Sequence, residues 1–288
     1  MKIQSPAKIN LFLQVTGKRA DGYHDLFSLM CCVSLYDTIQ LRFGGKGIEI
    51  ESAHPQVPLD KTNLAHKAAE LFYKKLGVQG GVKITIEKNI PVAAGLGGGS
   101  SNAASVLEGL NRFHSHPFPR ERLMSMGLRL GADVPFFLFE TPALASGIGE
   151  KLEAYPDLPK FHVVLVNPGF AVSTAEVFQN LNLGLTKCKK KLKKPSFRKT
   201  GYDVSRHLCN DLEAVTASRY PAIRSVKKQL LEQGALGALM SGSGPTVFGL
   251  FFDPEKAAAA RQVFCGNSRW KSFLVETVNK RHSVEDLF

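Results

Sequence analysis

The chain has 288 residues, a length that favours two packed domains over one. Hydrophobic residues make up 44% and charged residues 22%, values that exclude extensive disorder. The start of the chain lacks the continuous apolar stretch of a signal peptide, and no window offers the ~18 apolar residues of a membrane span.

The cysteines and the net charge bear on the redox state of the protein, its location and its partners. Five cysteines show no CxxC pair and no Cys/His zinc spacing, so we expect a reduced, metal-free, cytoplasmic protein. The net charge is +12, and most of it comes from eight basic residues between Lys187 and Lys199, a run with no acidic residue. Such a run is typical of a solvated segment, and attraction of an anionic ligand or RNA is the alternative.

The first predicted element is a strand over residues 8–16, where residues alternate between two faces. One face is apolar and the other carries Lys8, Asn10, Phe12 and Gln14. An edge strand with its polar face in water is one interpretation. In a buried strand the Lys8 ammonium needs a nearby aspartate or phosphate, because an isolated buried charge is costly.

Helix, strand and helix follow in turn. Helical spacing over residues 64–76, with Gly77 as a stop signal, predicts a helix. Residues 82–86 alternate as a strand that leads into a glycine-rich block, and the segment after Ser101 is predicted to be helical up to about Arg112.

The glycine-rich block is the sharpest feature, and it reads PVAAGLGGGSSNAA from Pro91 to Ala104. Glycines allow positive φ and close approach of backbone N–H groups, and the start of a helix adds its positive dipole end. The block therefore predicts a phosphate-binding turn, with Ser100 and Ser101 as hydroxyl donors to phosphate or magnesium. It is neither a GK[ST] motif nor a Rossmann GxGxxG, and a flexible loop with a serine N-cap is the alternative.

A single carboxylate, Asp133, stands in the apolar segment GADVPFFLF. It is suited to accept a proton from an attacking hydroxyl or to hold a metal. The N-cap of a short helix, with Pro135 in the first turn, is the alternative.

The later elements complete the predicted class. We expect strands over 162–166 and 246–252 and helices over 220–233 and 254–264. Strands and helices do not alternate strictly, so the class is α+β. Two prolines in residues 154–160 mark the predicted boundary between domains 1–155 and 156–288.

In this order, the blocks SPAKINL, PVAAGLGGGSSNAA, GADVPFF and SGSGPTVF resemble those of the GHMP kinases. With ADGYHDL added, they resemble the branch that phosphorylates 4-diphosphocytidyl-2-C-methyl-D-erythritol in the non-mevalonate isoprenoid pathway. The resemblance runs from Ser5 to about Phe252. It implies a two-domain fold, with an N-terminal domain like domain 2 of ribosomal protein S5 and a ferredoxin-like C-terminal domain.

The resemblance also implies roles for individual residues, with ATP and Mg²⁺ as cofactors. The catalytic pair would be Lys8 and Asp133, and Ser101 would reach the metal. Nucleotide contacts would come from Asn63, Lys88, Pro91, Gly95, Leu96, Gly97, Gly98, Gly99, Ser100 and Ser101. Substrate contacts would come from Asn10, Tyr23, His24, Thr174, Gly242, Ser243 and Gly244.

Two rival functions remain at this point. One is another GHMP-type kinase that acts on homoserine, a sugar or mevalonate. The other is a basic RNA-binding protein, although no RNP-type aromatic stretch is present. We expect small-molecule partners only, without nucleic acid or membrane, and a monomer or weak homodimer.

Overall fold

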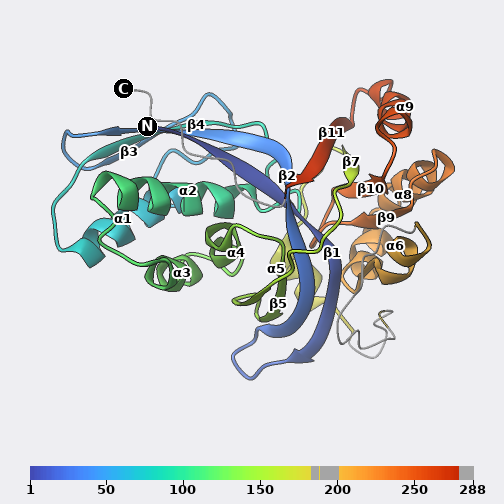
Figure 1. Cartoon of the computed structure of the whole chain (residues 1–288), viewed down its shortest axis with the longest axis horizontal. Helices are drawn as coiled ribbons and strands as arrows, with labels where there is room; N and C mark the ends of the chain where they lie inside the picture. Colours follow the sequence, from blue (N-terminus) through green and yellow to red (C-terminus); the bar gives the residue numbers. More distant parts are fainter. Residues whose placement is uncertain (183–187, 189–200, 279–288) are drawn as a thin grey trace.

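A computed structural model describes residues 1–182, 188 and 201–278 (Figure 1). Its backbone is organised around a long antiparallel hairpin of β1 (Lys2–Lys18) and β2 (His24–Phe43). These segments are rich in β-branched and aromatic residues, which favour extended structure. The hairpin bends between two groups of helices and contributes to both sides of the molecule.

The N-terminal side is a sheet covered by helices. Strands β3 (Ile48–Glu51) and β4 (Val82–Glu87) extend the sheet from β2 in the order β3-β4-β2. The helices on this side are α1 (Leu64–Leu76), α2 (Gly98–Phe113), α3 (Arg120–Leu128) and α4 (Val134–Phe139). The helices lie on one side of this sheet (Figure 1), and sheet and helices share one apolar core.

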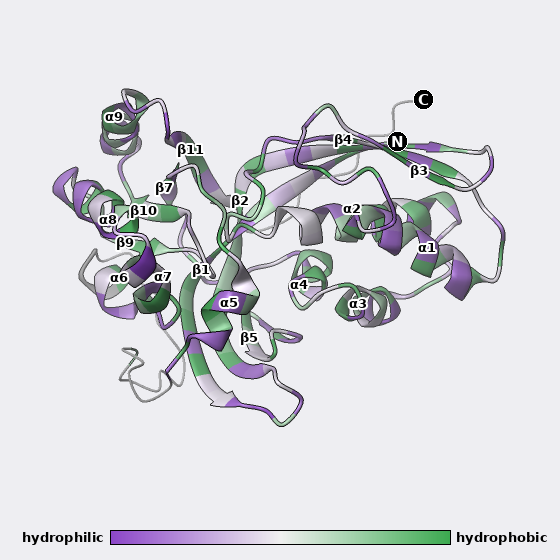
Figure 2. Cartoon of the chain, turned by 180° about the vertical axis from the view of Figure 1, so that it is seen from behind, coloured by the Kyte–Doolittle hydropathy of each residue, from purple (hydrophilic) through white to green (hydrophobic). Residues whose placement is uncertain are grey.

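Helix α1 illustrates how local signals set the element boundaries. The Asn63 side chain accepts a hydrogen bond from Ala65 N, and Gly77 ends the helix at a φ of 75°. Its apolar side, including Phe72, is buried, while its last turn carries lysines. The hydropathy colouring shows hydrophilic and hydrophobic residues in alternating patches along α1 (Figure 2).

The C-terminal side is an antiparallel sheet of β7 (His162–Asn167), β9 (Gly237–Met240), β10 (Val247–Phe251) and β11 (Lys271–Val278). The spatial order is β11-β7-β10-β9. In chain order within this group it is 4-1-3-2, the order of a ferredoxin-like split βαβ sheet. Helices α8 (Ala222–Glu232) and α9 (Pro254–Cys265) pack on it and confirm the α+β prediction.

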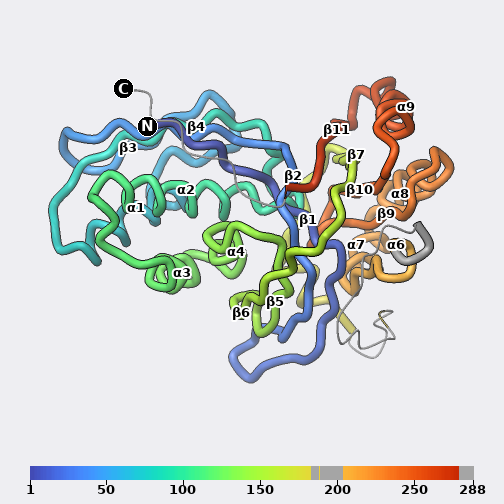
Figure 3. The backbone as a smooth tube through the Cα atoms, viewed as in Figure 1, coloured from blue at the N-terminus to red at the C-terminus, as the bar shows by residue number. Residues whose placement is uncertain are grey.

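Short elements lie near the bend of the hairpin. They are β5 (Ala143–Gly147), β6 (Lys151–Ala154), α5 (Thr174–Gln179), α6 (Gly201–His207), β8 (Cys209–Asn210) and α7 (Glu213–Arg219). Figure 1 shows α5 and β5 close to the hairpin, and Figure 3 shows α6 and α7 on its C-terminal side.

Strand β11 connects the two sheets. Residues Lys271–Glu276 pair with β7, and Thr277 and Val278 pair with Val33 and Cys32 of β2. The last described strand therefore returns to the N-terminal hairpin. The boundary between residues 155 and 156 stays a prediction.

The structure decides one open alternative and overturns two expectations. The edge-strand alternative for β1 does not hold, because Lys8 and Asn10 are only 4% and 2% exposed beneath the glycine-rich block. Helix α2 begins at Gly98, ahead of Ser101, because Gly97 takes the N-cap position. Cys188 and Cys209 form a disulfide, which contradicts the all-reduced expectation.

The disulfide has a long-range cause. Strand β8 pairs with β1, which brings Cys209 beside Phe12. Cys188 is held at the same place because its backbone N–H donates to Asp211 Oδ1 at 3.1 Å. The rest of the lysine-rich run lies outside the described residues.

Candidate active site

A cavity of about 1100 Å³ lies between the bent hairpin, the glycine-rich block and the C-terminal turn after β9. Its lining joins residues that are far apart in the sequence. Of the sequence-predicted site residues it includes Lys8, Asn10, Tyr23, His24, Asn63, Lys88, Pro91, Gly95, Gly97, Gly98, Gly99, Ser100, Asp133, Thr174, Gly242 and Ser243. The structure therefore brings most of the residues that the sequence singled out to one cavity.

The glycine-rich turn has the backbone that a phosphate site needs. Gly95 and Gly97 have φ values of 76° and 69°, and Gly97 precedes the first residue of α2. A Cβ at Gly97 would lie 2.9 Å from the Phe137 ring, and one at Gly98 would lie 2.8 Å from Lys88 Nζ. Side chains at these positions would fill the space at the helix start. The free N–H groups and positive dipole end of α2 consequently face the cavity.

Both sides of the molecule hold this turn in place. On the N-terminal side, Lys8 N donates to Leu96 O at 2.9 Å. On the C-terminal side, Ser241 Oγ donates to Gly95 O at 2.9 Å. Leu96 is buried and does not line the cavity, so its backbone carbonyl is the part that matters here.

Lys8 and Asp133 meet at the cavity. Lys8 Nζ lies 3.5 Å from Asp133 Oδ2 and donates to Asn10 Oδ1 at 2.6 Å. The Lys8 side chain is 5% exposed and the Asp133 side chain is 38% exposed. The ammonium thus has the polar partners that its burial requires, and the carboxylate is open to a ligand.

The geometry of Asp133 distinguishes a helix N-cap from a carboxylate that is available for chemistry. Asp133 occupies the N-cap position of α4, with Pro135 in the first turn, but its side chain makes no cap hydrogen bond. The carboxylate is directed to Lys8 instead. The Asp133 side chain therefore does not cap α4.

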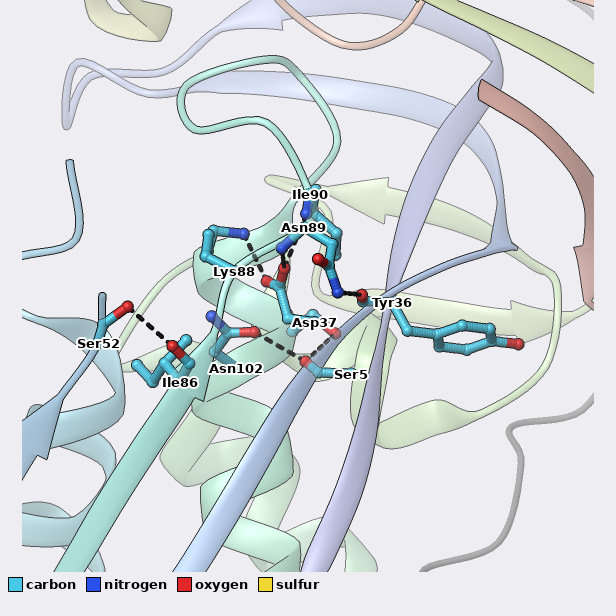
Figure 4. Close-up of polar contacts among 10 residues, drawn as sticks. Ser5, Tyr36, Asp37, Ser52, Ile86, Lys88, Asn89, Ile90 and Asn102 are labelled. Carbon is cyan, nitrogen blue, oxygen red and sulfur yellow. Dashed lines mark hydrogen bonds and ion pairs between the residues drawn. The ribbon is translucent and has the colours of Figure 1, made fainter. Parts of the chain in front are cut away.

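Lys88 lies in a buried ionic cluster at one side of the cavity (Figure 4). Its ammonium pairs with Asp37, which is completely buried. Asp37 Oδ1 also accepts from Asn89 N and Ile90 N, both at 2.8 Å. Burial lowers the pKa of Lys88 from its ordinary value, and Asp37 opposes that shift. The cluster fixes the chain just before the glycine-rich turn.

The two serines of the block have different surroundings. Ser101 is fully buried and its Oγ is hydrogen-bonded to Ser5 Oγ at 2.8 Å, next to the Ser5–Asn102 contact that Figure 4 also draws. Ser100 is partly exposed and lines the cavity, as does Asp133. Hydroxyl and carboxylate oxygens are ligands that Mg²⁺ accepts, so the donors present fit this ion.

The far end of the cavity is aromatic. Tyr23 is 59% exposed at the tip of the hairpin, while His24 is 9% exposed. The His24 ring stacks on Phe178 of α5 with a centroid distance of 5.1 Å and an interplanar angle of 25°. Burial, and secondarily the charge of Lys18, lower the pKa of His24 below its ordinary value of 6.5. A neutral imidazole has one donor and one acceptor to offer a ligand.

The C-terminal glycine turn lies against the glycine-rich block and contributes Gly242 and Ser243 to the cavity lining. Thr174 Oγ1 and Ser243 Oγ are 2.8 Å apart, and this contact joins α5 to the turn. Asn210 Nδ2 donates to Gly242 O at 2.7 Å. Gly244 has a φ of 84° and lies outside the lining, where it shapes the turn.

Some predicted and some unpredicted residues have structural partners of their own. Asn63 caps α1 and its Nδ2 donates to Pro58 O at 2.7 Å, although it also lines the cavity.

The sequence analysis did not single out Phe178 and Asp37. Phe178 follows Thr174 by four residues on one helix, so helical spacing offered a signal for it. Asp37 offered no local signal.

Two family models match the chain. The one described as GHMP kinases N terminal domain matches residues 63–141, and the one described as GHMP kinases C terminal matches residues 188–268. The two matches cover the glycine-rich block, Asp133 and the C-terminal glycine turn.

Curated relatives match nearly the whole chain. A 4-diphosphocytidyl-2-C-methyl-D-erythritol kinase of Syntrophotalea carbinolica is 51% identical, with 96% of this chain and 98% of that protein covered. The kinase of the same name from Geobacter sulfurreducens is 45% identical, with 96% and 99% covered.

Solved structures agree in fold. A crystal structure of 4-(cytidine 5'-diphospho)-2C-methyl-D-erythritol kinase superposes with a TM-score of 0.83 at 33% identity, covering 96% of this chain and 100% of the other. The homoserine kinase of Cytophaga hutchinsonii gives a TM-score of 0.75 at 20% identity, with 98% and 95% covered. The latter likeness concerns the fold alone.

Proposed function

Because the chain belongs to the GHMP kinases and, among them, to the 4-diphosphocytidyl-2-C-methyl-D-erythritol kinases, we propose that it transfers the γ-phosphoryl group of ATP to the C2 hydroxyl of that alcohol. The enzyme is a small-molecule kinase of isoprenoid biosynthesis. Neither another alcohol nor RNA is favoured as the substrate, since the named relatives are almost as long as this chain and match throughout.

One observation carries the roles of individual residues. The Lys8–Asp133 pair lies in the same cavity as the glycine-rich turn and the aromatic end with Tyr23 and His24. With the ATP phosphates on the glycine-rich turn and the cytosine of the substrate at the aromatic end, the acceptor hydroxyl would lie beside this pair. Phosphoryl transfer depends mainly on such positioning and on neutralised charge.

Asp133 is suited to orient the hydroxyl and accept its proton. Its carboxylate is open to the cavity and has no cap hydrogen bond to give up. The Lys8 ammonium, 3.5 Å away, would stabilise negative charge on the attacking oxygen. The proton acceptor, Asp133, and the ammonium of Lys8 are therefore adjacent before the substrate binds.

The glycine-rich turn would hold the phosphates through backbone N–H groups at the start of α2, from Gly97 to Ser100. Asn63, Lys88 and Pro91 line the same side of the cavity and would contact the rest of the nucleotide. When bound, Mg²⁺ neutralises charge on the phosphates, and Asp133, Ser100 and Ser101 are its candidate ligands. Of these, Asp133 and Ser100 line the cavity.

The aromatic end would recognise the cytosine. Tyr23 offers a stacking surface, and His24 offers hydrogen bonds from a neutral ring. Asn10, Thr174 and the 242–244 turn would contact the remainder of the alcohol. Uracil exchanges an amine donor for a carbonyl acceptor and gains a proton at N3, so it presents the wrong pattern.

A panel of alcohols tests this function. ATP consumption by the whole chain would be followed with the cytidine diphosphate alcohol, homoserine, galactose and mevalonate at equal concentrations. We expect turnover with the first compound and background rates with the others. Equal or faster turnover with homoserine, galactose or mevalonate would overturn the substrate assignment while leaving the kinase family intact.

The cellular setting is a separate proposal. No helix among the described residues is long and apolar enough to cross a bilayer. A cytoplasmic location, a monomer or weak homodimer and the absence of nucleic-acid partners stay predictions.

A further inference from the structure

A buried serine on β2, Ser28, lines the same cavity as Lys8 and Asp133. Ser28 is 3% exposed and pairs in register with Leu13 of β1. Its hydroxyl makes two hydrogen bonds, one to Phe12 O at 2.6 Å and one from Asn10 Nδ2 at 2.9 Å. The site described above gives Ser28 no role of its own.

The direction of these two bonds is fixed by proton count. A serine hydroxyl has one proton, and Phe12 O can only accept. The Ser28 proton is therefore committed to Phe12 O, and toward Asn10 the Ser28 oxygen can only accept. A β-bulge in β1 lies between the two residues that Ser28 contacts. The pairing moves from Asn10–Met30 to Phe12–Leu29, so Leu11 is the extra residue.

This constraint sets which end of the Asn10 amide faces Lys8. With Nδ2 directed to Ser28, the carbonyl Oδ1 is turned to Lys8 Nζ at 2.6 Å. Rotation of the amide by half a turn would direct N–H groups at an ammonium that is 95% buried, a repulsive contact of high cost. The ammonium would then lose the acceptor that holds it 3.5 Å from Asp133.

We propose that Ser28 is a positioning residue, which fixes the orientation of the Asn10 amide and thereby holds the Lys8 ammonium beside Asp133. The inference rests on the proposed function, because it takes Lys8 and Asp133 as the groups at the reacting oxygen. Although Ser28 lines the cavity, its one hydroxyl proton is bonded to Phe12 O, so it acts on Lys8 through Asn10.

The test compares Ser28→Ala with Ser34→Ala. Ser34 is on the same strand, and its hydroxyl accepts one backbone hydrogen bond, from Glu276 N at 2.9 Å, away from the cavity. We expect Ser28→Ala to lower kcat about 10- to 100-fold, as for loss of a hydrogen bond that supports a charged group, with KM for ATP unchanged. Ser34→Ala should leave kcat unchanged. Ser28→Thr, which keeps the hydroxyl, should recover most of the rate.

A double variant distinguishes positioning from general loosening of the fold. If Ser28 acts through Asn10, the Asn10→Ala/Ser28→Ala enzyme should have the kcat of Asn10→Ala alone. Multiplicative losses, or a Ser28→Ala kcat within twofold of wild type, would overturn the proposal. Lys8→Ala and Asp133→Asn are measured in parallel. Full turnover in those two would instead contradict the proposed catalytic pair, so the two failures can be told apart.

Discussion

The two ends of the cavity differ in how much of their geometry exists before substrate binds. At the catalytic end Lys8, Asn10 and Ser28 are each less than 5% exposed and joined by hydrogen bonds. At the aromatic end Tyr23 is 59% exposed on a hairpin tip, where Arg19 and Asp21 form an exposed ion pair.

Physical chemistry accounts for the difference. A buried ammonium must have its partners in place in the folded protein, since an unpaired one is too costly. An exposed ion pair contributes little, so the hairpin tip is held weakly. We therefore expect catalysis to depend on a preformed pair, and recognition of the cytosine to depend on contacts that the substrate completes.

Removal of the carboxylate should have the largest effect. Asp133→Asn is expected to lower kcat ~10²- to 10⁴-fold, the usual cost of losing a general base. Stability should change little, because the side chain is 38% exposed and caps no helix. Steady-state kinetics and thermal unfolding would be compared with Asp157→Asn, an exposed aspartate outside the cavity lining. A folded Asp133→Asn enzyme with wild-type kcat would rule out the base.

A methyl group on the glycine-rich turn should have the next largest effect. In Gly97→Ala, an alanine is forced to a φ near 69°, with its Cβ 3.1 Å from Lys8 Cγ. Such strain costs of order 1–3 kcal/mol, and the crowding disturbs the phosphate site. We expect weaker ATP binding by calorimetry. Gly266→Ala, at a φ of −76° with open space around it, is the control and should bind ATP normally. Unchanged ATP affinity in Gly97→Ala would argue against a phosphate turn.

The exposed aromatic ring should affect substrate binding without affecting the chemical step. Tyr23→Ala is expected to raise KM for the cytidine alcohol by the loss of stacking, worth ~1–3 kcal/mol. At saturation kcat should remain near wild type, as should KM for ATP. Tyr23→Phe keeps the ring and should behave like wild type. A large drop in kcat for Tyr23→Ala would show that the two ends are not separable.

The smallest effect expected is a pH dependence of substrate binding. The pKa of His24 is below 6.5, so the ring is neutral at pH 7 and gains a proton only as the pH falls through that lowered value. KM for the alcohol should therefore be flat above about pH 6.5 and rise below it, while KM for ATP does not follow. In Lys18→Met the inflection should move upward, because one cause of the lowered pKa is removed. An unshifted inflection would exclude a contribution from Lys18.

The sequence was most informative where local chemistry decides structure. Helix α1 has its predicted bounds because Gly77 permits a left-handed stop, and the glycine-rich turn precedes a helix as expected. Asp133 stood out because it is a single carboxylate in an apolar segment. Lys8 and Asn10 stood out because two polar residues on one strand face need partners.

The rest depended on contacts between distant segments. Nothing near Lys8 in the sequence shows that the glycine-rich turn covers its strand, which is why a solvated polar face was a reasonable alternative. Asp37 precedes Lys88 by 51 residues, and Cys188 meets Cys209 only because β8 pairs with β1. Phe178 and His24, which are likewise far apart in the sequence, stack on each other at the aromatic end of the cavity.

The most direct measurement is the product formed by the whole chain from ATP with 4-diphosphocytidyl-2-C-methyl-D-erythritol, in parallel with the free methylerythritol alcohol. Phosphorus NMR would locate the new phosphate ester and give the ratio of ADP to product. The account predicts one ADP for each ester at the C2 hydroxyl of the cytidine compound and no measurable product from the free alcohol. Comparable phosphorylation of both alcohols would contradict it, because the aromatic end of the cavity would then have no part in selecting the substrate.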